Sequence, residues 1–207
     1  LITGASSGIG RSVADMFYNR GYEVFGIGRN FSFDPLWNKI EIDLNDTDSM
    51  CDLIRNLLKE NHFTVLVNSA GVAYYGLHSN IEIEMIKSMV RTNIEVPMII
   101  SSVFLDYYKK NKIEGYIFNI SSVTACNSNT YGACYGATKA ALSNFSTSIF
   151  DENRKHGIKV IDILPDMTDT NLYRNADFTV EFFFINNKVA ASCYAALTHT
   201  SCYYCSM

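Results

Sequence analysis

The chain has 207 residues, of which 48% are hydrophobic and 18% charged, and its formal net charge is −4. This length suits one domain with one sizeable core. The slight negative net charge does not favour a nucleic-acid partner, which needs a clustered basic surface. No stretch reaches the ~18 uninterrupted apolar residues of a membrane span, no signal peptide is visible, and the cysteines are scattered, so we expect no membrane partner and a cytoplasmic location.

The chain begins on the end of a strand at 1–3, which leads into the segment Thr3-Gly4-Ala5-Ser6-Ser7-Gly8-Ile9-Gly10. A helix is predicted at 10–20, because apolar residues recur there with helical spacing. Glycines let the backbone turn tightly and approach a pyrophosphate, and the N-terminus of a helix supplies unpaired N–H groups. With a strand before it and a helix after it, this loop is predicted to bind a dinucleotide.

The second predicted strand, at 23–28, ends in Gly28-Arg29-Asn30, without an acidic residue. An NAD site usually places Asp or Glu at this point, on the ribose hydroxyls. A guanidinium instead suits a 2′-phosphate, so Arg29 favours NADP(H) over NAD(H) as the cofactor. The alternative interpretation of Arg29 is an ordinary surface arginine.

The remaining elements alternate in the same way. A short strand at 39–42 precedes a helix that Asp46 caps and that runs to about 60. A strand at 64–68 precedes a mostly helical stretch at 81–110, interrupted near Asn93 and Pro97. Further strands are predicted at 115–120 and 159–164 and further helices at 131–156 and 187–197, and another strand could start within 202–207.

This alternation predicts an α/β fold with a Rossmann-like, doubly wound parallel sheet and helices on both faces. We expect residues 1–207 to form a single dinucleotide-binding and catalytic domain, incomplete at both ends. In such sheets ligands bind beyond the carboxyl ends of the strands. The loops after Thr3, Gly28, Asn68, Ile120 and Leu164 are therefore predicted to line one site.

Tyr135 and Lys139 lie four residues apart near the start of the helix predicted at 131–156, and so share one face of it. An ammonium group beside a phenol favours the phenolate and lowers its pKa from the usual value of about 10. This is what a tyrosine needs to exchange protons near neutral pH. Ser122 follows the strand at 115–120 and is the accompanying serine candidate, with Ser121 as the alternative.

In order from Thr3 to Thr170, these segments resemble short-chain dehydrogenases/reductases. The first loop is similar to the family's TGxxxGxG motif, Asn68-Ser69-Ala70-Gly71 to its NNAG motif, and Pro165–Thr170 to PGxxxT, with Asp166 in place of glycine. The resemblance implies a catalytic tetrad of Asn93, Ser122, Tyr135 and Lys139. It implies cofactor contacts from Gly4, Ser6, Ser7, Gly8, Ile9, Gly10, Arg29, Asp43, Leu44, Asn68, Ala70, Gly71, Tyr135, Lys139, Pro165, Thr168 and Thr170.

Within this tetrad the resemblance implies that Ser122 binds the substrate oxygen and Tyr135 transfers the proton. Lys139 lowers the pKa of Tyr135 and holds the nicotinamide ribose. Asn93 holds a water that links Lys139 to solvent, or is simply an amide at a helix kink. In the glycine loop Ser7 stands where NADP-binding relatives have a basic residue, and Arg11 is the candidate substitute.

Outside the tetrad, the resemblance implies a homodimer or homotetramer that pairs through the helices around 93–110 and 131–156. The family's last strand is expected to be absent or cut short, which favours the dimer. Three interpretations are open for Phe178, Phe182, Phe183 and Phe184: an apolar lid on the substrate site, core residues, or a strand-like edge.

Two other functions remain open: a cofactor-binding regulatory or interaction module, and a sugar-nucleotide epimerase or dehydratase. A damaged tetrad would indicate the first, and a TGxxGxxG loop is typical of the second. The four histidines form no metal-ligand spacing with another His or Cys, so no metal is predicted. The predicted partner is a small-molecule carbonyl or alcohol substrate.

Overall fold

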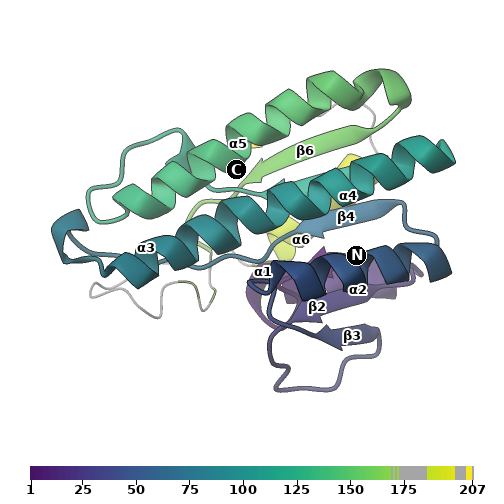
Figure 1. The fold of residues 1–207 in the computed structure, drawn as a ribbon, viewed down its shortest axis with the longest axis horizontal. Helices are drawn as coiled ribbons and strands as arrows, with labels where there is room; N and C mark the ends of the chain where they lie inside the picture. The colour runs from purple at the N-terminus through teal and green to yellow at the C-terminus, as the bar shows by residue number, and fades with distance from the viewer. Residues whose placement is uncertain (169, 171, 173–185, 199–203, 207) are drawn as a thin grey trace.

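The computed structural model describes residues 1–168, 170, 172, 186–198 and 204–206. In this part of the chain a parallel sheet of seven strands has the order β3-β2-β1-β4-β5-β6-β7 (Figure 1). The strands are β1 (Ile2–Thr3), β2 (Phe25–Gly28), β3 (Asn38–Glu41), β4 (Val65–Asn68), β5 (Tyr116–Ile120), β6 (Lys159–Leu164) and β7 (Tyr204–Ser206). The order reverses beside β1, which makes the sheet doubly wound and places a switch point at the end of the first strand.

Helices cover both faces of this sheet. The helices α1 (Gly8–Asn19) and α6 (Asn186–Thr198) pack together on one face, and α2 (Thr47–Glu60), α4 (Val96–Asn111) and α5 (Ala133–Asn153) lie on the other (Figure 1). The helix α3 (Ile83–Val90) leads into α4, and short turns of 3₁₀-helix occur at η1 (His78–Asn80), η3 (Val123–Ala125) and η4 (Arg154–His156). The predicted Rossmann-like α/β fold is confirmed. No helix among the described residues combines the length and apolar character needed to cross a membrane.

Two apolar layers hold the helices to the sheet. On the α2, α4 and α5 side, Met50, Ile54 and Phe104 are fully buried against strand residues. On the α1 and α6 side, Val13 and Val189 are fully buried in the same way. Burying one such side chain stabilises the fold by about 1.5–3 kcal/mol, so both layers contribute to holding the strand ends in register.

The two interruptions predicted near Asn93 and Pro97 are one structural event. A π-helical turn, η2 (Arg91–Glu95), joins α3 directly to α4, and Pro97 lies in the first turn of α4. Proline has no N–H to donate to the carbonyl four residues earlier, which here is that of Asn93. The backbone widens instead, and the N–H of Val96 bonds to the carbonyl of Arg91. Such π-turns are frequent at functional sites.

The last strand lies where the sequence suggested that another strand could start, within 202–207. β7 pairs in parallel with β6 over three residues, with Cys205 opposite Ile163. The choice between a dimer and a tetramer stays a prediction. The proposed lid residues Phe178, Phe182, Phe183 and Phe184 lie outside the described residues.

Candidate active site

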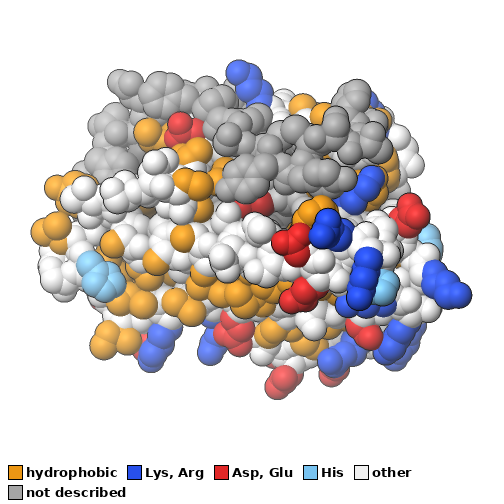
Figure 2. Space-filling view, turned by 90° about the horizontal axis from the view of Figure 1, so that it is seen from above, with side chains coloured by type: hydrophobic (Ala, Val, Ile, Leu, Met, Phe, Trp, Pro, Cys, Tyr) orange, Lys and Arg blue, Asp and Glu red, His pale blue; other side chains and the backbone are white. Residues whose placement is uncertain are grey.

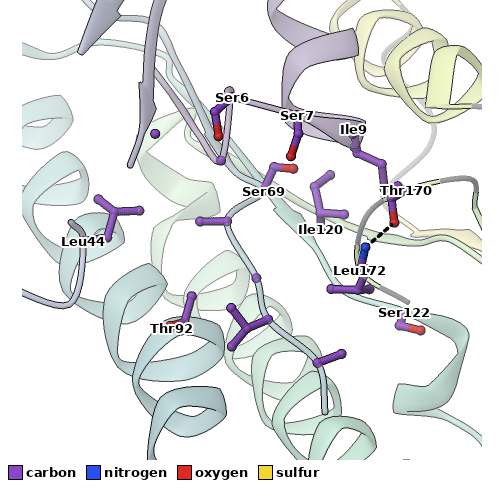
Figure 3. A pocket seen from close by; sticks show the side chains of 18 of the residues that line it. Ser6, Ser7, Ile9, Leu44, Ser69, Thr92, Ile120, Ser122, Thr170 and Leu172 are labelled. Atoms are coloured by element: carbon purple, nitrogen blue, oxygen red, sulfur yellow. Dashed lines mark hydrogen bonds between the residues drawn. The ribbon is translucent and has the colours of Figure 1, made fainter. Parts of the chain in front are cut away.

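A cavity of about 210 Å³ opens at the carboxyl ends of the central strands, where the loops after the strands were predicted to line one site. Figure 3 shows side chains from the first loop, from the segment after β4 and from the segment after β6 converging on it. The lining includes these residues of the predicted site: Gly4, Ser6, Ser7, Gly8, Ile9, Gly10, Arg29, Asp43, Leu44, Ala70, Gly71, Ser122, Tyr135, Lys139, Pro165, Thr168 and Thr170. Asn68 and Asn93, also predicted, are not part of the lining.

The first loop is packed too tightly to carry side chains at its glycines. A Cβ on Gly10 would lie 2.4 Å from the carbonyl oxygen of Gly4, and one on Gly4 would lie 2.8 Å from the backbone of Ala70. Thr3 holds the two loops together, because its Oγ1 accepts hydrogen bonds from the N–H groups of Ser69 and Ala70, both at 3.1 Å. The loop thus brings bare backbone to the N-terminus of α1, the arrangement that suits a pyrophosphate.

Two further observations concern the end of this cavity that lies after β2. Arg29 is exposed and lines the cavity directly after β2. Gly28 lies beside Ser6 so closely that a Cβ there would be 2.8 Å from the Cβ of Ser6. Arg11 lies elsewhere: its guanidinium stacks 3.7 Å from the ring centre of Phe33 and its Nε lies 3.6 Å from Asp15. Arg29 is therefore the basic side chain that this end of the cavity presents.

Asn68 has a different place from the one the motif implied. It is buried, and its Nδ2 donates to the hydroxyl of Ser101 at 3.1 Å and to Oδ1 of Asn119 at 2.8 Å. The amide of Asn119 in turn donates to the hydroxyl of Ser146 on α5 at 2.8 Å. This chain of amides ties β4, β5, α4 and α5 together behind the cavity, so Asn68 positions the strand end instead of lining the site.

Tyr135 lies in the first turn of α5 and is 4% exposed. It lines the cavity and packs at a ring-centre distance of 5.9 Å from Tyr75, in an apolar cluster with Ala73 and Met89. The Nζ of Lys139, one turn further along α5, lies 5.7 Å from the ring centre of Tyr135. The predicted pairing of the two side chains on one helical face is present.

Lys139 is 5% exposed, and its ammonium donates a hydrogen bond of 2.8 Å to the carbonyl oxygen of Ile120. Burial lowers the pKa of Lys139 to about 8, and the negative charge of Asp162 opposes that shift. The neutral form of this lysine is thus accessible at mildly alkaline pH. A fully solvated lysine would stay charged there.

The two serines after β5 have different surroundings. The hydroxyl of Ser121 donates to the carbonyl oxygen of Lys139 at 3.0 Å and so fixes α5 to β5. The hydroxyl of Ser122 caps η3 by accepting from the N–H of Thr124 at 3.2 Å, and its side chain lines the cavity (Figure 3). Both line the cavity, but among the described residues Ser122, unlike Ser121, donates its hydrogen to no acceptor and can offer it to a ligand.

Asn93 clamps the segment after β4 to α5. Its Oδ1 accepts from the N–H of Val72 at 2.9 Å, while its Nδ2 donates to the carbonyl of Val72 at 2.9 Å and to the hydroxyl of Thr138 at 3.0 Å. The side chain is fully buried. The geometry matches the amide at a helix kink that the sequence suggested as its second interpretation.

The segment after β6 closes the remaining side. Its Pro165 carbonyl accepts from the N–H of Val123 at 3.1 Å, which ties it to the segment that carries Ser122. Thr170 accepts from the N–H of Leu172 at 3.2 Å, drawn as the dashed line in Figure 3. A Cβ on Gly8 would lie 3.3 Å from Thr170, so this segment meets the first loop across the cavity.

Several lining residues were not predicted as site residues, although Ser69 and Asp166 belong to the quoted motifs and Ser121 was the alternative serine. They are Gly28, Ile42, Asn45, Ser69, Val72, Ala73, Thr92, Ile120, Ser121, Asp166 and Leu172. Most of them are neighbours of motif residues, so their place at the end of a strand was the available signal. Within the described ranges, no three His, Cys, Asp or Glu side chains gather as metal ligands.

Comparison with known proteins agrees with this geometry. The family profile described as "short chain dehydrogenase" matches residues 1–179. A probable short-chain type dehydrogenase/reductase of Helicobacter pylori is 31% identical over 85% of this chain and 67% of its own length. Serine 3-dehydrogenase of Agrobacterium fabrum is 31% identical over 82% of this chain and 72% of its own.

Two solved structures extend the likeness to the fold. A 4-hydroxyisoleucine dehydrogenase complexed with NADH and succinate has a TM-score of 0.85 and 25% identity, with 96% of this chain and 90% of that chain covered. A short-chain dehydrogenase from Sphingobium yanoikuyae in complex with NADPH has a TM-score of 0.86 over 95% of this chain and 83% of that chain. The second is 22% identical and is a likeness of fold alone.

Proposed function

This chain belongs to the short-chain dehydrogenase family and is an NAD(P)-dependent oxidoreductase, and we propose that it interconverts an alcohol and a ketone or aldehyde with NADP(H), using Tyr135 as the general acid/base. The observation that supports this most directly is the convergence of Ser122, Tyr135 and Lys139 on the cavity that also contains the glycine loop. Three separate segments of the chain bring these groups together.

Each of these residues has its own role in the proposed reaction. Ser122 donates a hydrogen bond to the substrate oxygen, and Tyr135 gives a proton to that oxygen during reduction or removes it during oxidation. Lys139 stabilises the phenolate of Tyr135 by its positive charge. The bare backbone of the glycine loop fits the pyrophosphate of a dinucleotide. A bound nicotinamide supplies or accepts the hydride.

The two other functions have less support. The first loop has three residues between Gly4 and Gly8, unlike the TGxxGxxG spacing of epimerases and dehydratases. A regulatory module needs no proton-transfer group, whereas Tyr135 and Lys139 both line the cavity. The test is oxidation of NADPH by aldehydes and ketones of graded chain length. Binding of NADPH without turnover of any of them would favour the module.

Arg29 is proposed to select NADPH through the 2′-phosphate, because it is the basic side chain at the end of β2 and no acid stands there. We expect Arg29→Asp to weaken NADPH binding roughly 10- to 100-fold, the range of a lost charged hydrogen bond, and to leave NADH binding nearly unchanged. Fluorescence titration of both cofactors measures this. The control is Arg55→Asp, which makes the same charge reversal at an exposed side chain of α2. Equal affinities of the parent for both cofactors would remove the assignment.

The protein is also proposed to be at least a homodimer that pairs through α4 and α5. Ile99, Val103 and Phe145 on these helices stay partly exposed, and Figure 2 shows hydrophobic side chains gathered in a band on the side where α5 lies. We expect light scattering to give a dimer or tetramer at micromolar concentration and Val103→Arg to shift it toward monomer. Asn187→Arg, at an exposed position of α6, should leave the oligomeric state unchanged. A monomeric parent would contradict the proposal.

The cytoplasmic location and the single catalytic domain over residues 1–207 remain predictions from the sequence.

A further inference from the structure

A buried carboxylate lies behind the catalytic helix. Asp162 is in the middle of β6, 3% exposed, opposite Asn119 of β5 and Tyr204 of β7 in the ladder. Its side chain faces α5, where the hydroxyl of Ser143 donates a hydrogen bond to its Oδ2. Nothing in the sequence analysis singled out this residue.

The buried carboxylate of Asp162 accepts fewer hydrogen bonds than its two oxygens allow. Its Oδ1 has no hydrogen-bond partner among the described residues, although a carboxylate can accept at both oxygens. A buried carboxylate is costly unless an opposite charge compensates it. A cation near Asp162 is therefore required if it is to stay ionised.

Lys139 is the cation in the right place. It lies one helical turn before Ser143 on the same face of α5, and Tyr135 lies one turn earlier still. Its ammonium binds the carbonyl of Ile120, the residue next to the ladder partner of Asp162. The ammonium of Lys139 and the carboxylate of Asp162 thus both lie between α5 and the sheet, at neighbouring levels of the β5–β6 ladder. No direct ion pair joins them among the described residues, so the two charges act on each other through space.

The charges of the two groups are coupled. Burial raises the pKa of Asp162 to about 6, and the hydrogen bond from Ser143 and the charge of Lys139 both oppose that rise. Burial lowers the pKa of Lys139, and the negative charge of Asp162 raises it in part. Asn119, beside Asp162 in the ladder, and Ser143, which binds it from α5, are both uncharged. At neutral pH the pair is therefore mainly carboxylate and ammonium.

We propose that Asp162 is a positioning residue for this reaction: held by Ser143, its buried carboxylate keeps Lys139 in the ammonium form on which Tyr135 depends. The inference rests on the proposed roles of Tyr135 and Lys139. Asp162 touches neither substrate nor cofactor, because it is not part of the cavity lining. It acts through the charge of Lys139 alone.

The test uses Asp162→Asn, which keeps the shape of the side chain and removes its charge. NMR titration of labelled lysine in the cofactor-free protein, with Lys139→Met to assign the signal, measures the pKa of Lys139 directly. We expect about 8 in the parent and a value lower by roughly one unit in Asp162→Asn. The pH–rate profile of alcohol oxidation should move to higher pH, so that the rate near pH 7 falls roughly tenfold.

Two further variants keep the test decisive. Ser143→Ala should lower the pKa of Lys139 in the same direction but less, because it removes only the hydrogen bond that stabilises the carboxylate. Asp151→Asn makes the same charge change on the exposed end of α5 and should alter nothing. If Asp162→Asn does not fold, the pKa of Lys139 is measured in Ser143→Ala instead.

An unchanged pKa of Lys139 in Asp162→Asn and in Ser143→Ala would overturn the inference. So would a lowered pKa with an unmoved pH–rate profile, because the coupling would then have no use in the reaction. Neither result bears on Tyr135 itself, whose role is tested by its own substitution. The failure of this inference and the failure of the proposed function are therefore distinguishable.

Discussion

Tyr135→Phe is expected to fold and to bind NADPH like the parent, yet to lose hydride transfer by roughly 10²- to 10⁴-fold, the usual contribution of a general acid/base. The phenylalanine keeps the ring that packs against Tyr75 in the cluster with Ala73 and Met89. Only the hydroxyl is removed. The loss should therefore fall on turnover and spare stability.

Single-turnover hydride transfer with a confirmed substrate is the appropriate measurement, because it isolates the chemical step from product release. Tyr131→Phe is the matched control: Tyr131 is 52% exposed, precedes α5 and is not part of the cavity lining. A rate in Tyr135→Phe within a few-fold of the parent, at normal NADPH affinity, would remove Tyr135 from the mechanism. It would also revive the regulatory module as the function.

Gly10→Ala should weaken cofactor binding severely, although it adds one methyl group. The new Cβ would lie 2.4 Å from the carbonyl oxygen of Gly4 and 3.1 Å from the backbone N of Ala5, and backbone atoms cannot rotate away as a side chain can. The first loop must therefore shift, at a cost of about 1–3 kcal/mol, which is typical of overpacking. If that cost falls on the bound conformation, NADPH affinity drops roughly 5- to 150-fold.

Gly21→Ala provides the comparison for Gly10→Ala. Gly21 ends the turn after α1 with a φ of 85°, and a Cβ there would meet no atom within 4 Å. Alanine at this position should lower thermal stability through backbone strain alone and leave NADPH affinity intact. Equal affinity losses in the two variants, measured by the same fluorescence titration, would show that the tight approach at Gly10 has no part in binding.

Local patterns in the sequence were sufficient for the fold class and for most of the cavity. The apolar periodicity predicted the helices, and Asp46 correctly marked the start of α2 through its bond to the N–H of Ser49. The glycine loop and the pair Tyr135 and Lys139 could also be recognised in the sequence. Each is a short segment whose chemistry depends on neighbours within one helical turn. The residues after each strand then had to meet, since parallel strands end at one edge.

Contacts between distant segments decided the rest. Asn68 carries a family motif, but its partners Ser101 and Asn119 lie 33 and 51 residues away and turn it from the cavity into the structure behind it. Arg11 follows the glycine loop, but Phe33 and Asp15 hold its side chain. In both cases the residue type allowed either place, and packing selected one.

Asp162 is the clearest case of what only the tertiary structure decided. In the sequence it is one acid within an apolar strand, with no partner in reach. Its significance comes from Ser143, 19 residues earlier on α5, and from Lys139 one turn before that serine. The electrostatic coupling depends on the distance between β6 and α5 and on the burial of both side chains between them. Neither quantity is encoded by any short segment, because both arise when the two elements pack.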